Sequence, residues 1–326
     1  MAEVYQQPSV KTRFENFKVD PARAKAEAEA AVAGGVFTDS PADDALIQKS
    51  LKGNDSNGLS IMSDWNEFRM SASMESVLKG YKDPRMSEYF LPNNSTKDNP
   101  NGTGQYDGLR NGLTATQLTE TPNLATSNAK PGKRWSSPSF GGSDSYLQTP
   151  QNIMSVAEAY FLRAEGALLG WNMNGTAKDL YEAGIKQSML QWGITDAAKI
   201  TAYINSSDVP VAPEDFLKSP AVSKAPVKFA SDVATQREQI AIQKWLAIYP
   251  DGTEAWADYR RSRTFILYPV ANSENPDIPD PKVKWIRRIP FLLSETQNNA
   301  AAVNAAVPLL GSGGDKVTTP LWWDKN

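Results

Sequence analysis

The chain has 326 residues and a formal net charge of −3, from 34 Lys and Arg against 37 Asp and Glu. This length can bury a substantial core in one large domain or two ordinary ones. No apolar run approaches the roughly 20 residues that a membrane-spanning helix needs. No stripe of Lys and Arg offers the positive surface on which nucleic-acid binding depends. We therefore expect a globular protein that spans no bilayer and binds no nucleic acid.

Two residue types are missing altogether, because the sequence contains no cysteine and no histidine. Their absence excludes disulfides, thiol nucleophiles, Ser-His-Asp triads, imidazole bases and the usual zinc and iron ligands. The catalytic chemistry that is left comprises a carboxylate pair, a lysine base or calcium held by oxygen ligands. We expect no cofactor and no bound metal.

Helical patterns begin close to the start of the chain. Residues 20–33 open with Asp-Pro, continue in Ala and Glu, and stop at a Gly-Gly pair, so both ends of a helix are marked. Residues 64–80 predict a second helix that ends at a glycine. Its apolar residues at helical spacing are Phe68, Met70, Met74, Val77 and Leu78.

Residues 91–150 have a different composition from the helical segments. They are rich in Asn, Gly, Ser and Pro, with isolated aromatic residues at Tyr106, Trp135, Phe140 and Tyr146. Long loops inside compact domains are uncommon unless they carry a function. We therefore expect a loop-rich insertion here and look for binding residues in it.

A pair of longer helices follows this loop-rich region. Residues 155–170 start with Ser155 as the expected N-cap and Glu158 three positions later, which is the spacing of a capping box. A second helix starts after Thr176, and the connection of a few residues predicts an antiparallel hairpin.

A second helix pair is predicted from about residue 234 to Arg263, with a turn at Pro-Asp-Gly. Large rings on a helical stripe more often form a core than a ligand platform, so we expect Trp245 and Trp256 to be buried. Helix pairs of this kind are typical of tetratricopeptide units, although these two start about 80 residues apart rather than 34. The predicted fold class is mainly α, with tetratricopeptide-like helix pairs and long irregular loop insertions.

Seven short segments, taken in order, carry a family resemblance. They are MSASMESVLKGYKDPRMSEYF, YDGLRNGL, AEAYFLRAEGALLGW, AKDLYEAGIKQSMLQWG, QKWLAIYPDGTEAWADYRR, RRIPFLLSETQNN and TPLWWD. Together they resemble the SusD/RagB-like outer-membrane lipoproteins of Bacteroidetes, over nearly the whole chain. The resemblance implies a SusD-like α-α superhelix at the cell surface of the outer membrane. It also implies a binding protein without catalysis, which holds an oligosaccharide, or in some members a peptide, over a SusC-type TonB-dependent transporter.

Two features of the chain differ from the pattern of that family. Members begin with a lipoprotein signal and a lipidated cysteine, whereas MAEVYQQPSVK lacks the pattern of a signal peptide and suits a cytosolic protein, a mature protein or an expression product. Members are also longer. We expect residues 1–326 to form a single SusD-like helical domain that lacks the amino-terminal helix pairs of the family and binds its ligand more weakly than a longer form.

The family shares no binding motif, so candidate ligand residues must be chosen by their chemistry. A sugar offers one apolar ring face and a rim of hydroxyls, so its binder needs an aromatic plane beside polar groups. We predict an accessible indole at Trp135. The alternative is that each aromatic residue only pins the long loop to the helices. The candidates are Trp135 with Arg134, Tyr146 with Asp144, and Tyr106 with Asp107 and Arg110.

Two other functions stay open from the sequence. One is a helix-pair scaffold that binds a peptide or another protein, for which a concave apolar or charged groove is the mark. The other, weaker alternative is a glycoside hydrolase with two carboxyl groups about 5 to 9 Å apart. The predicted function is non-catalytic binding of an oligosaccharide.

Overall fold

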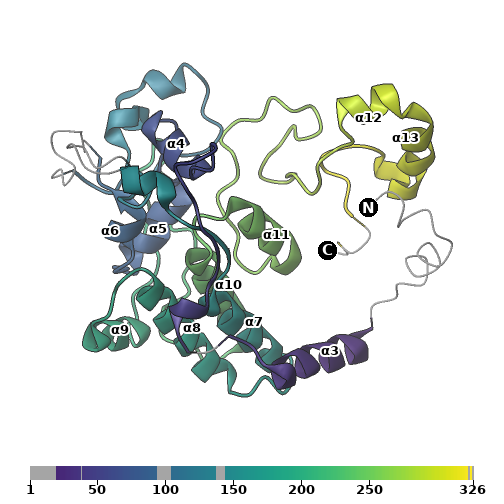
Figure 1. Cartoon of the computed structure of the whole chain (residues 1–326). Coiled ribbons are helices and arrows are strands. Elements are labelled where there is room, and N and C mark those ends of the chain that lie inside the picture. Colours follow the sequence, from purple (N-terminus) through teal and green to yellow (C-terminus); the bar gives the residue numbers. More distant parts are fainter. Residues whose placement is uncertain (1–19, 38, 94–103, 137–143, 322–323, 325–326) are drawn as a thin grey trace.

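The computed structural model describes residues 20–37, 39–93, 104–136, 144–321 and 324, and most of its regular structure is helical (Figure 1). This confirms the mainly helical fold class. The helices are α3 (Pro21–Gly34), α4 (Gly58–Asp64), α5 (Ala72–Gly80), α6 (Met86–Tyr89), α7 (Val156–Leu168), α8 (Ala177–Gln191), α9 (Ala197–Ile204), α10 (Val233–Ala247), α11 (Gly252–Ser262), α12 (Leu293–Asn298) and α13 (Ala300–Ala306).

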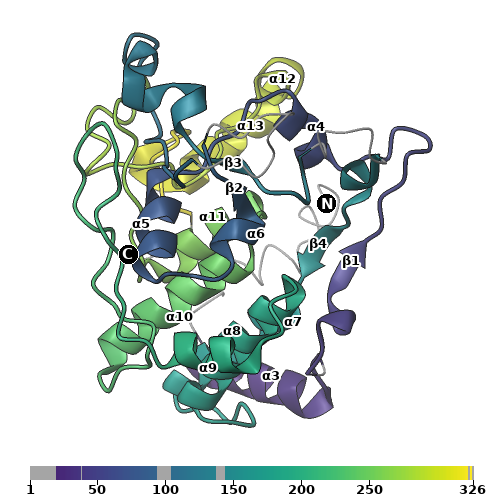
Figure 2. The same cartoon turned by 90° about the vertical axis from the view of Figure 1, so that its left-hand side faces the viewer.

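Short strands and 3₁₀ turns connect these helices. The strands are β1 (Ala45–Ile47), β2 (Phe90–Leu91), β3 (Lys130–Pro131) and β4 (Gln151–Met154), and the 3₁₀ turns are η1 (Pro41–Asp43), η2 (Gln117–Thr119), η3 (Thr121–Asn123), η4 (Ala125–Ser127), η5 (Asp144–Gln148) and η6 (Val307–Gly313). The strands form two antiparallel pairs, β1 with β4 and β2 with β3. Figure 2 shows β1 and β4 side by side along one edge of the molecule, between α7 and α4.

The predicted hairpin of α7 and α8 is confirmed, and its two caps are formed as expected. The Ser155 hydroxyl accepts the backbone N–H of Glu158 at 3.1 Å, and the Thr176 hydroxyl accepts that of Asp179 at 3.1 Å. Small residues allow the helices to approach closely, since a Cβ placed on Gly184 of α8 would lie 2.7 Å from the Phe161 ring of α7. A larger side chain at this position would force the pair apart.

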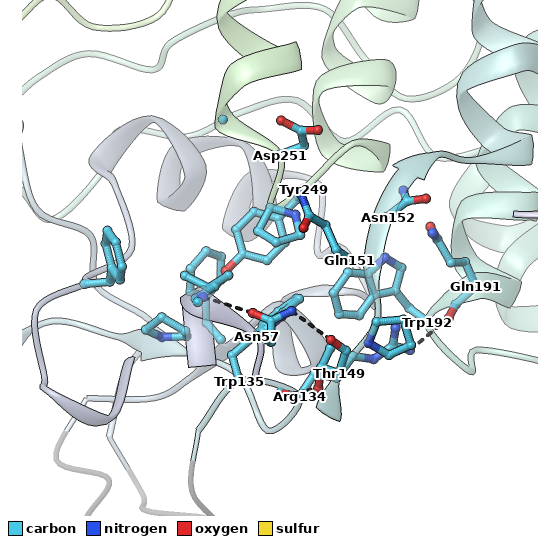
Figure 3. A pocket seen from close by; sticks show the side chains of 18 of the residues that line it. Asn57, Arg134, Trp135, Thr149, Gln151, Asn152, Gln191, Trp192, Tyr249 and Asp251 are labelled. Carbon is cyan, nitrogen blue, oxygen red and sulfur yellow. Dashed lines mark hydrogen bonds between the residues drawn. The ribbon is translucent and has the colours of Figure 1, made fainter. Parts of the chain in front are cut away.

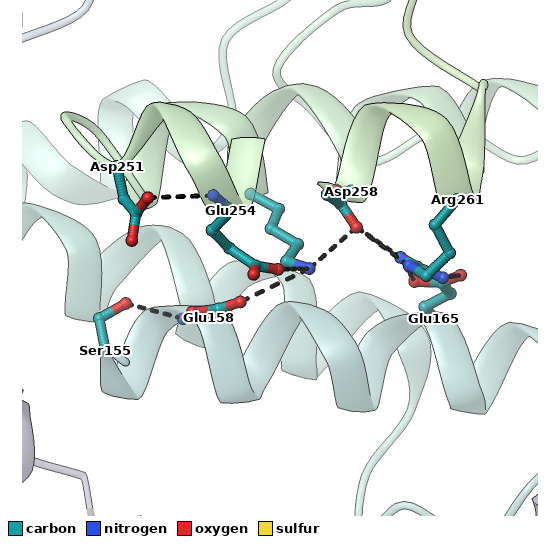
Figure 4. Close-up of polar contacts among 8 residues, drawn as sticks. Ser155, Glu158, Glu165, Asp251, Glu254, Asp258 and Arg261 are labelled. Carbon is teal, nitrogen blue, oxygen red and sulfur yellow. Dashed lines mark hydrogen bonds and ion pairs between the residues drawn. The ribbon is translucent and has the colours of Figure 1, made fainter. Parts of the chain in front are cut away.

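Helix α10 packs against this hairpin, and a buried ammonium group ties it to both α7 and α11 (Figure 4). Lys244 of α10 lies 3.0 Å from Asp258 of α11 and 3.6 Å from Glu158 of α7. Asp258 also pairs with Arg261 at 2.7 Å, and Arg261 pairs with Glu165 of α7 at 2.6 Å. These charges are mutually compensated, which is the condition under which buried ions are tolerated.

The two tryptophans expected in the core differ from each other. Trp245 is partly buried and packs against the core, with its ring 5.4 Å from that of Phe265. Trp256 lies outside the core cluster, with the Arg260 guanidinium 3.7 Å from its ring centroid and its indole N–H donating to the Ile286 carbonyl at 3.4 Å. The core expectation for Trp256 is therefore wrong, because its ring contacts Arg260 and the carboxyl-terminal segment at Ile286 instead of the core.

The single helix predicted over residues 64–80 is in fact two helices, α4 and α5. Asn66 has a positive φ of 65°, a conformation that no α-helix continues through, so the chain leaves the helix there. Helix α5 then begins with Ser71, whose hydroxyl accepts the Met74 N–H at 3.2 Å. Phe68 lies in the segment between the two helices, outside the core, and is 38% exposed.

A buried charge cluster fixes the turn between α5 and α6 against the helical layer. The fully buried guanidinium of Arg85 bonds to Asp83 at 2.6 Å, to Ser188 of α8 at 2.9 Å and to Gln243 of α10 at 2.8 Å. Burial alone would lower the pKa of Arg85, but the neighbouring Asp83 carboxylate holds it well above its usual value. The guanidinium therefore stays charged and connects three parts of the fold.

Candidate functional site

A cavity of about 1100 Å³ lies where segments far apart in the sequence come together (Figure 3). Its walls come from α4 and the start of α5, from β2 and β3, from β4, from the end of α8 and from the turn between α10 and α11. A volume of this size is typical of small-molecule sites, which are concave and mostly apolar with a few placed polar groups. We therefore take this cavity as the candidate functional site.

Aromatic rings form one wall of the cavity. Trp135, which follows β3, and Trp192, at the end of α8, have ring centroids 5.4 Å apart. Tyr249, at the end of α10, lies 5.5 Å from Trp135 and 5.2 Å from Phe90 of β2. These spacings fall in the range where aromatic rings attract one another. Mutual packing therefore positions each ring, and Figure 3 shows Trp135, Trp192 and Tyr249 grouped around the cavity.

Arg134 joins this aromatic wall to the end of α8. Its guanidinium lies 4.0 Å from the Trp192 ring centroid and donates to the Gln191 carbonyl at 2.8 Å. Burial lowers the pKa of Arg134, an effect that the charge of Glu88 partly offsets. The Arg134 guanidinium is therefore already bonded within the protein, and its contacts fix the aromatic wall to the end of α8.

Amide side chains form the polar part of the lining. Asn57 caps α4 by accepting the Leu59 N–H at 2.9 Å and reaches across to donate to the Thr149 carbonyl at 2.8 Å. Gln151 and Asn152 of β4 and Gln191 of α8 complete this set. Figure 3 shows Asn152 and Gln191 among the side chains that line the cavity.

Three buried polar atoms of the lining have no hydrogen-bond partner among the described residues. They are Asn152 Oδ1, Gln191 Oε1 and the indole nitrogen of Trp192. A buried polar group without a partner costs about 1–3 kcal/mol, so unpaired groups mark places that deserve an explanation. All three have almost no surface accessible to solvent, so a ligand reaches them only after a side-chain rotation. The lining therefore holds one donor and two acceptors that no described residue satisfies.

The cavity lining contains two carboxylates, Asp44 and Asp251, within the part of the chain that the structure describes. Asp44 accepts the Val156 N–H at 2.8 Å, and Asp251 caps α11 by accepting the N–H groups of Thr253 and Glu254 at 3.0 Å. Burial raises the pKa of Asp44, and hydrogen bonds from Val156 and Gln191 partly offset that effect. Asp251 is thus the N-cap of α11, while Asp44 accepts the first N–H group of α7 beside the Ser155 cap. No group of three or more acidic side chains among the described residues is placed to hold a metal ion.

The structure brings one of the predicted pairs to the cavity, because Arg134 and Trp135 both line it. The expectation of an accessible indole at Trp135 is nevertheless wrong, since only 3% of the residue is exposed. The loop folds back after β3, where the Trp135 N–H donates to the Gly132 carbonyl at 3.0 Å. This turn inserts the ring between Trp192 and Tyr249 instead of presenting it to solvent.

The other predicted residues lie outside the described cavity lining and make internal contacts. Tyr106 packs partly buried against the core. Arg110 is 9% exposed, pairs with Asp215 at 3.3 Å and donates to the Pro269 carbonyl at 2.8 Å. Tyr146 of η5 donates to Asp64 at the end of α4. These contacts hold the long loop against the helices, which is the alternative weighed for them. Asp144 opens η5, and its side chain lies outside the described part of the chain.

Several lining residues were missed by the sequence reasoning. Trp192 is the C-cap of α8 and also lines the cavity. The amides on β4 and α8 carry no motif; Gln151 and Asn152 are held by the pairing of β4 with β1, and Gln191 ends α8. The missed residues are Asn57, Gln151, Asn152, Gln191, Trp192, Tyr249 and Asp251.

Among the helices of the described residues, none combines the length and apolar character that a bilayer crossing requires. No curated protein sequence matches the chain. Residues 13–324 match the SusD-like family, described as Susd and RagB outer membrane lipoprotein.

Solved structures of this family resemble the chain throughout its length. A chitin-binding SusD homologue from Flavobacterium johnsoniae is 36% identical with a TM-score of 0.75, over 94% of this chain and 60% of that protein. A SusD-like protein from Bacteroides thetaiotaomicron is 34% identical with a TM-score of 0.78, over 94% and 60%. A second SusD homologue from that organism is 28% identical with a TM-score of 0.78, over 95% and 62%. The chain thus spans less than two thirds of the length of these relatives. On this match and these structures, the chain belongs to the SusD-like family of outer membrane lipoproteins.

Proposed function

We propose that the chain binds an oligosaccharide without chemical conversion and presents it to a SusC-type TonB-dependent transporter at the outer membrane. SusD-like proteins are binding proteins rather than enzymes. The relative from Flavobacterium johnsoniae, 36% identical, is a chitin-binding protein, which supports a carbohydrate as the ligand class. The observation that carries the proposal is the 1100 Å³ cavity, because it combines aromatic walls with unpaired amide groups.

The chemistry of the cavity suits a neutral sugar chain. Sugar rings stack their apolar faces on aromatic side chains and use their hydroxyls as both donors and acceptors. Phe68 offers an exposed ring in the lining, and Asn152, Gln191 and Trp192 offer one donor and two acceptors once their side chains rotate toward the ligand. Arg134 is already bonded within the protein, so an anionic ligand gains little from it.

The residues chosen from the sequence take different parts in this proposal. Arg134 and Trp135 support the aromatic wall that the ligand meets. Tyr106, Arg110 and Tyr146 act indirectly by fixing the loop, while Asp144 stays a prediction. Asp44 and Asp251 each accept backbone N–H groups through one carboxylate oxygen, and the reducing-end assay below decides between binding and a carboxylate-pair glycosidase.

A glycan array that includes casein peptides as a control is the first test, and calorimetric titration then gives the affinity for each bound glycan. We expect Phe68→Ala to weaken oligosaccharide binding about tenfold, which corresponds to about 1.4 kcal/mol. Phe216→Ala is the matched control, because Phe216 is 37% exposed against 38% for Phe68 and lies outside the described lining. The control should keep wild-type affinity.

Three outcomes would contradict the proposal. Binding of casein peptides but no glycan would favour the peptide-binding alternative. Release of reducing ends from a bound glycan, abolished by Asp44→Asn or Asp251→Asn, would show a hydrolase. An equal loss of affinity in the Phe68 and Phe216 variants would place the ligand elsewhere than in the cavity. Delivery is tested separately, by co-purification of the chain with a SusC-type TonB-dependent transporter.

A further inference from the structure

Trp65 is the only tryptophan among the described residues that is mostly exposed, with 66% of it accessible to solvent. It is the C-cap of α4, three positions after Met62 and three before Phe68, and both of these residues line the cavity. Residues three apart on a helix share a face, so Trp65 lies beside Met62 at the rim of the cavity. A single exposed apolar side chain is ordinary on a protein surface, so the case for a function depends on how this one is held.

Residues 65–69, which we call the aromatic turn, are held in one shape by a single cation. The Arg69 guanidinium donates to the carbonyls of Asn66 at 3.0 Å, Phe68 at 2.6 Å and Ala125 at 2.8 Å. It also donates to the side-chain oxygen of Asn66 at 2.8 Å. The turn is therefore bonded both to itself and to the neighbouring loop. Its aromatic side chains are positioned before any ligand arrives, which reduces the entropic cost of binding.

Polar residues flank the Trp65 indole along the chain. Asp64, Asn66 and Glu67 are all exposed, and the Asp64 carboxylate accepts the hydroxyl of Tyr146. A protein-binding surface has an apolar centre with polar groups at its rim. One aromatic ring among amide and carboxylate groups instead matches a sugar, which has an apolar ring face and hydroxyls around it. The chemistry of the turn therefore favours a carbohydrate over a protein partner.

We propose that Trp65 stacks on a sugar ring that lies outside the cavity, so that the protein selects oligosaccharides longer than the cavity alone holds. This inference rests on the proposed function and adds a second contact to the same site. Phe68 connects the two contacts, because it lines the cavity and belongs to the aromatic turn. A short oligosaccharide gains nothing from Trp65, whereas a long one gains the stacking contact. The consequence is a preference for chain length.

Calorimetric titration with a disaccharide and a hexasaccharide of one glycan is the first test. Chitin oligosaccharides are tried first, because the Flavobacterium johnsoniae homologue is a chitin-binding protein, and the glycan array supplies the series if chitin does not bind. We expect Trp65→Ala to weaken hexasaccharide binding about tenfold and to leave disaccharide binding unchanged. Trp65→Tyr keeps a stacking ring and should retain most of the hexasaccharide affinity. Leu293→Ala, at a residue of α12 that is 71% exposed, is the control and should change neither affinity.

A dye beside the indole gives a second test that leaves Trp65 in place. The sequence has no cysteine, so Glu67→Cys carries a single thiol in the aromatic turn, where an environment-sensitive fluorescent dye is attached. Glu27→Cys is the matched control, because Glu27 is also exposed and lies on α3, which Figures 1 and 2 both show far from α4. We expect the hexasaccharide, and not the disaccharide, to change the dye fluorescence at position 67. Neither ligand should change it at position 27.

The outcomes separate this inference from the proposed function. Thermal melting first establishes that Trp65→Ala is as stable as the wild type, and a large loss of stability would show that the ring packs within the fold. Weaker binding in Phe68→Ala together with full hexasaccharide affinity in Trp65→Ala supports the cavity and overturns the role of Trp65. An equal loss for both ligand lengths also overturns it. A dye signal from casein peptides and from no glycan would identify a peptide site. A wild-type chain that binds no glycan contradicts the proposed function and this inference together.

Discussion

Two regions of the molecule contain buried polar groups: the contact where α10 meets α7 and α11, and the wall of the cavity. They differ in whether those polar groups have partners. At the helix contact, Lys244 is matched by carboxylates on two sides, and Asp258 is shared with Arg261 (Figure 4). In the cavity wall, Asn152, Gln191 and Trp192 keep buried atoms without a partner among the described residues (Figure 3). We call the charges at the helix contact the closed set, because each has a partner of opposite sign within the protein and is used to stabilise the fold: Glu158, Glu165, Lys244, Asp258 and Arg261. A set with free donors and acceptors can also serve a ligand.

The largest effect on the free energy of unfolding is expected when the buried cation of the closed set is removed. Lys244→Met leaves Glu158 and Asp258 without their shared cation, and breaking a buried ion pair typically costs about 3–5 kcal/mol. Lys82→Met is the control, since Lys82 makes an ion pair of similar length at 2.8 Å but is 76% exposed and should cost at most about 1 kcal/mol. Urea denaturation measures both. Equal losses in the two variants would show that burial gives this contact no special weight.

The next effect concerns Trp135 and corrects the expectation drawn from the sequence. Because the ring is buried between Trp192 and Tyr249, Trp135→Ala should lower the free energy of unfolding by about 3–5 kcal/mol. An exposed indole would cost far less. A melting temperature that stays at the wild-type value, combined with lost oligosaccharide binding, would restore the view of Trp135 as a ligand platform.

A smaller effect is expected from the unpaired indole nitrogen. Trp192→Phe keeps an aromatic ring but removes the N–H that has no partner, so its lost contacts are partly offset and stability should change by less than about 1 kcal/mol. Oligosaccharide affinity should fall, because the ligand loses one donor. Unchanged affinity by calorimetric titration would mean that the ligand never reaches this atom.

The smallest effect is a pH dependence within the closed set. Burial raises the pKa of Glu158 above its usual 4.5, although Lys244 partly opposes this. The folded state therefore holds this proton more tightly than the unfolded state, so wild-type stability relative to Glu158→Gln should rise as the pH falls from 7 toward 4.5. The slope cannot exceed about 1.4 kcal/mol per pH unit for one group. Denaturation curves at several pH values test this, and a falling difference would reverse the assignment.

Asp258 has the opposite behaviour in the same set. Burial would raise its pKa, but Lys244 and Arg261 outweigh that effect and hold it below its usual 3.8. Its contribution to stability is therefore present above pH 3.8 and is lost only as the pH falls through the lower folded value. The window from pH 7 to 4.5 consequently reports on Glu158 with little interference from Asp258.

The parts of the fold that were predicted correctly depend on local chemistry. Ser155 and Thr176 are the N-caps of α7 and α8 because their hydroxyls accept backbone N–H groups three residues later. Capping residues of this kind can be recognised from the sequence alone. The break between α4 and α5 was missed because it depends on Asn66 adopting a positive φ, which helical periodicity does not report.

The candidate site was harder to predict, because its members meet only through tertiary structure. Arg134 and Trp135 were found as an aromatic residue beside a cation. Asn152, Gln191 and Tyr249 lie on three different elements and follow no common spacing, so nothing in their local sequence indicates that they share a cavity. The burial of Trp135 likewise depends on partners more than 50 residues away in the sequence.

The pairing of β1 with β4 has a consequence for the order in which the molecule assembles. Ala45 lies opposite Met154, so this short ladder closes a loop of about a hundred residues, whereas α7 and α8 meet across a single turn. Contacts between distant residues are entropically costly and form late, so we expect the helical hairpin to appear first in refolding. The cavity is then completed in the last step, and a refolding intermediate would be helical while still unable to hold a ligand.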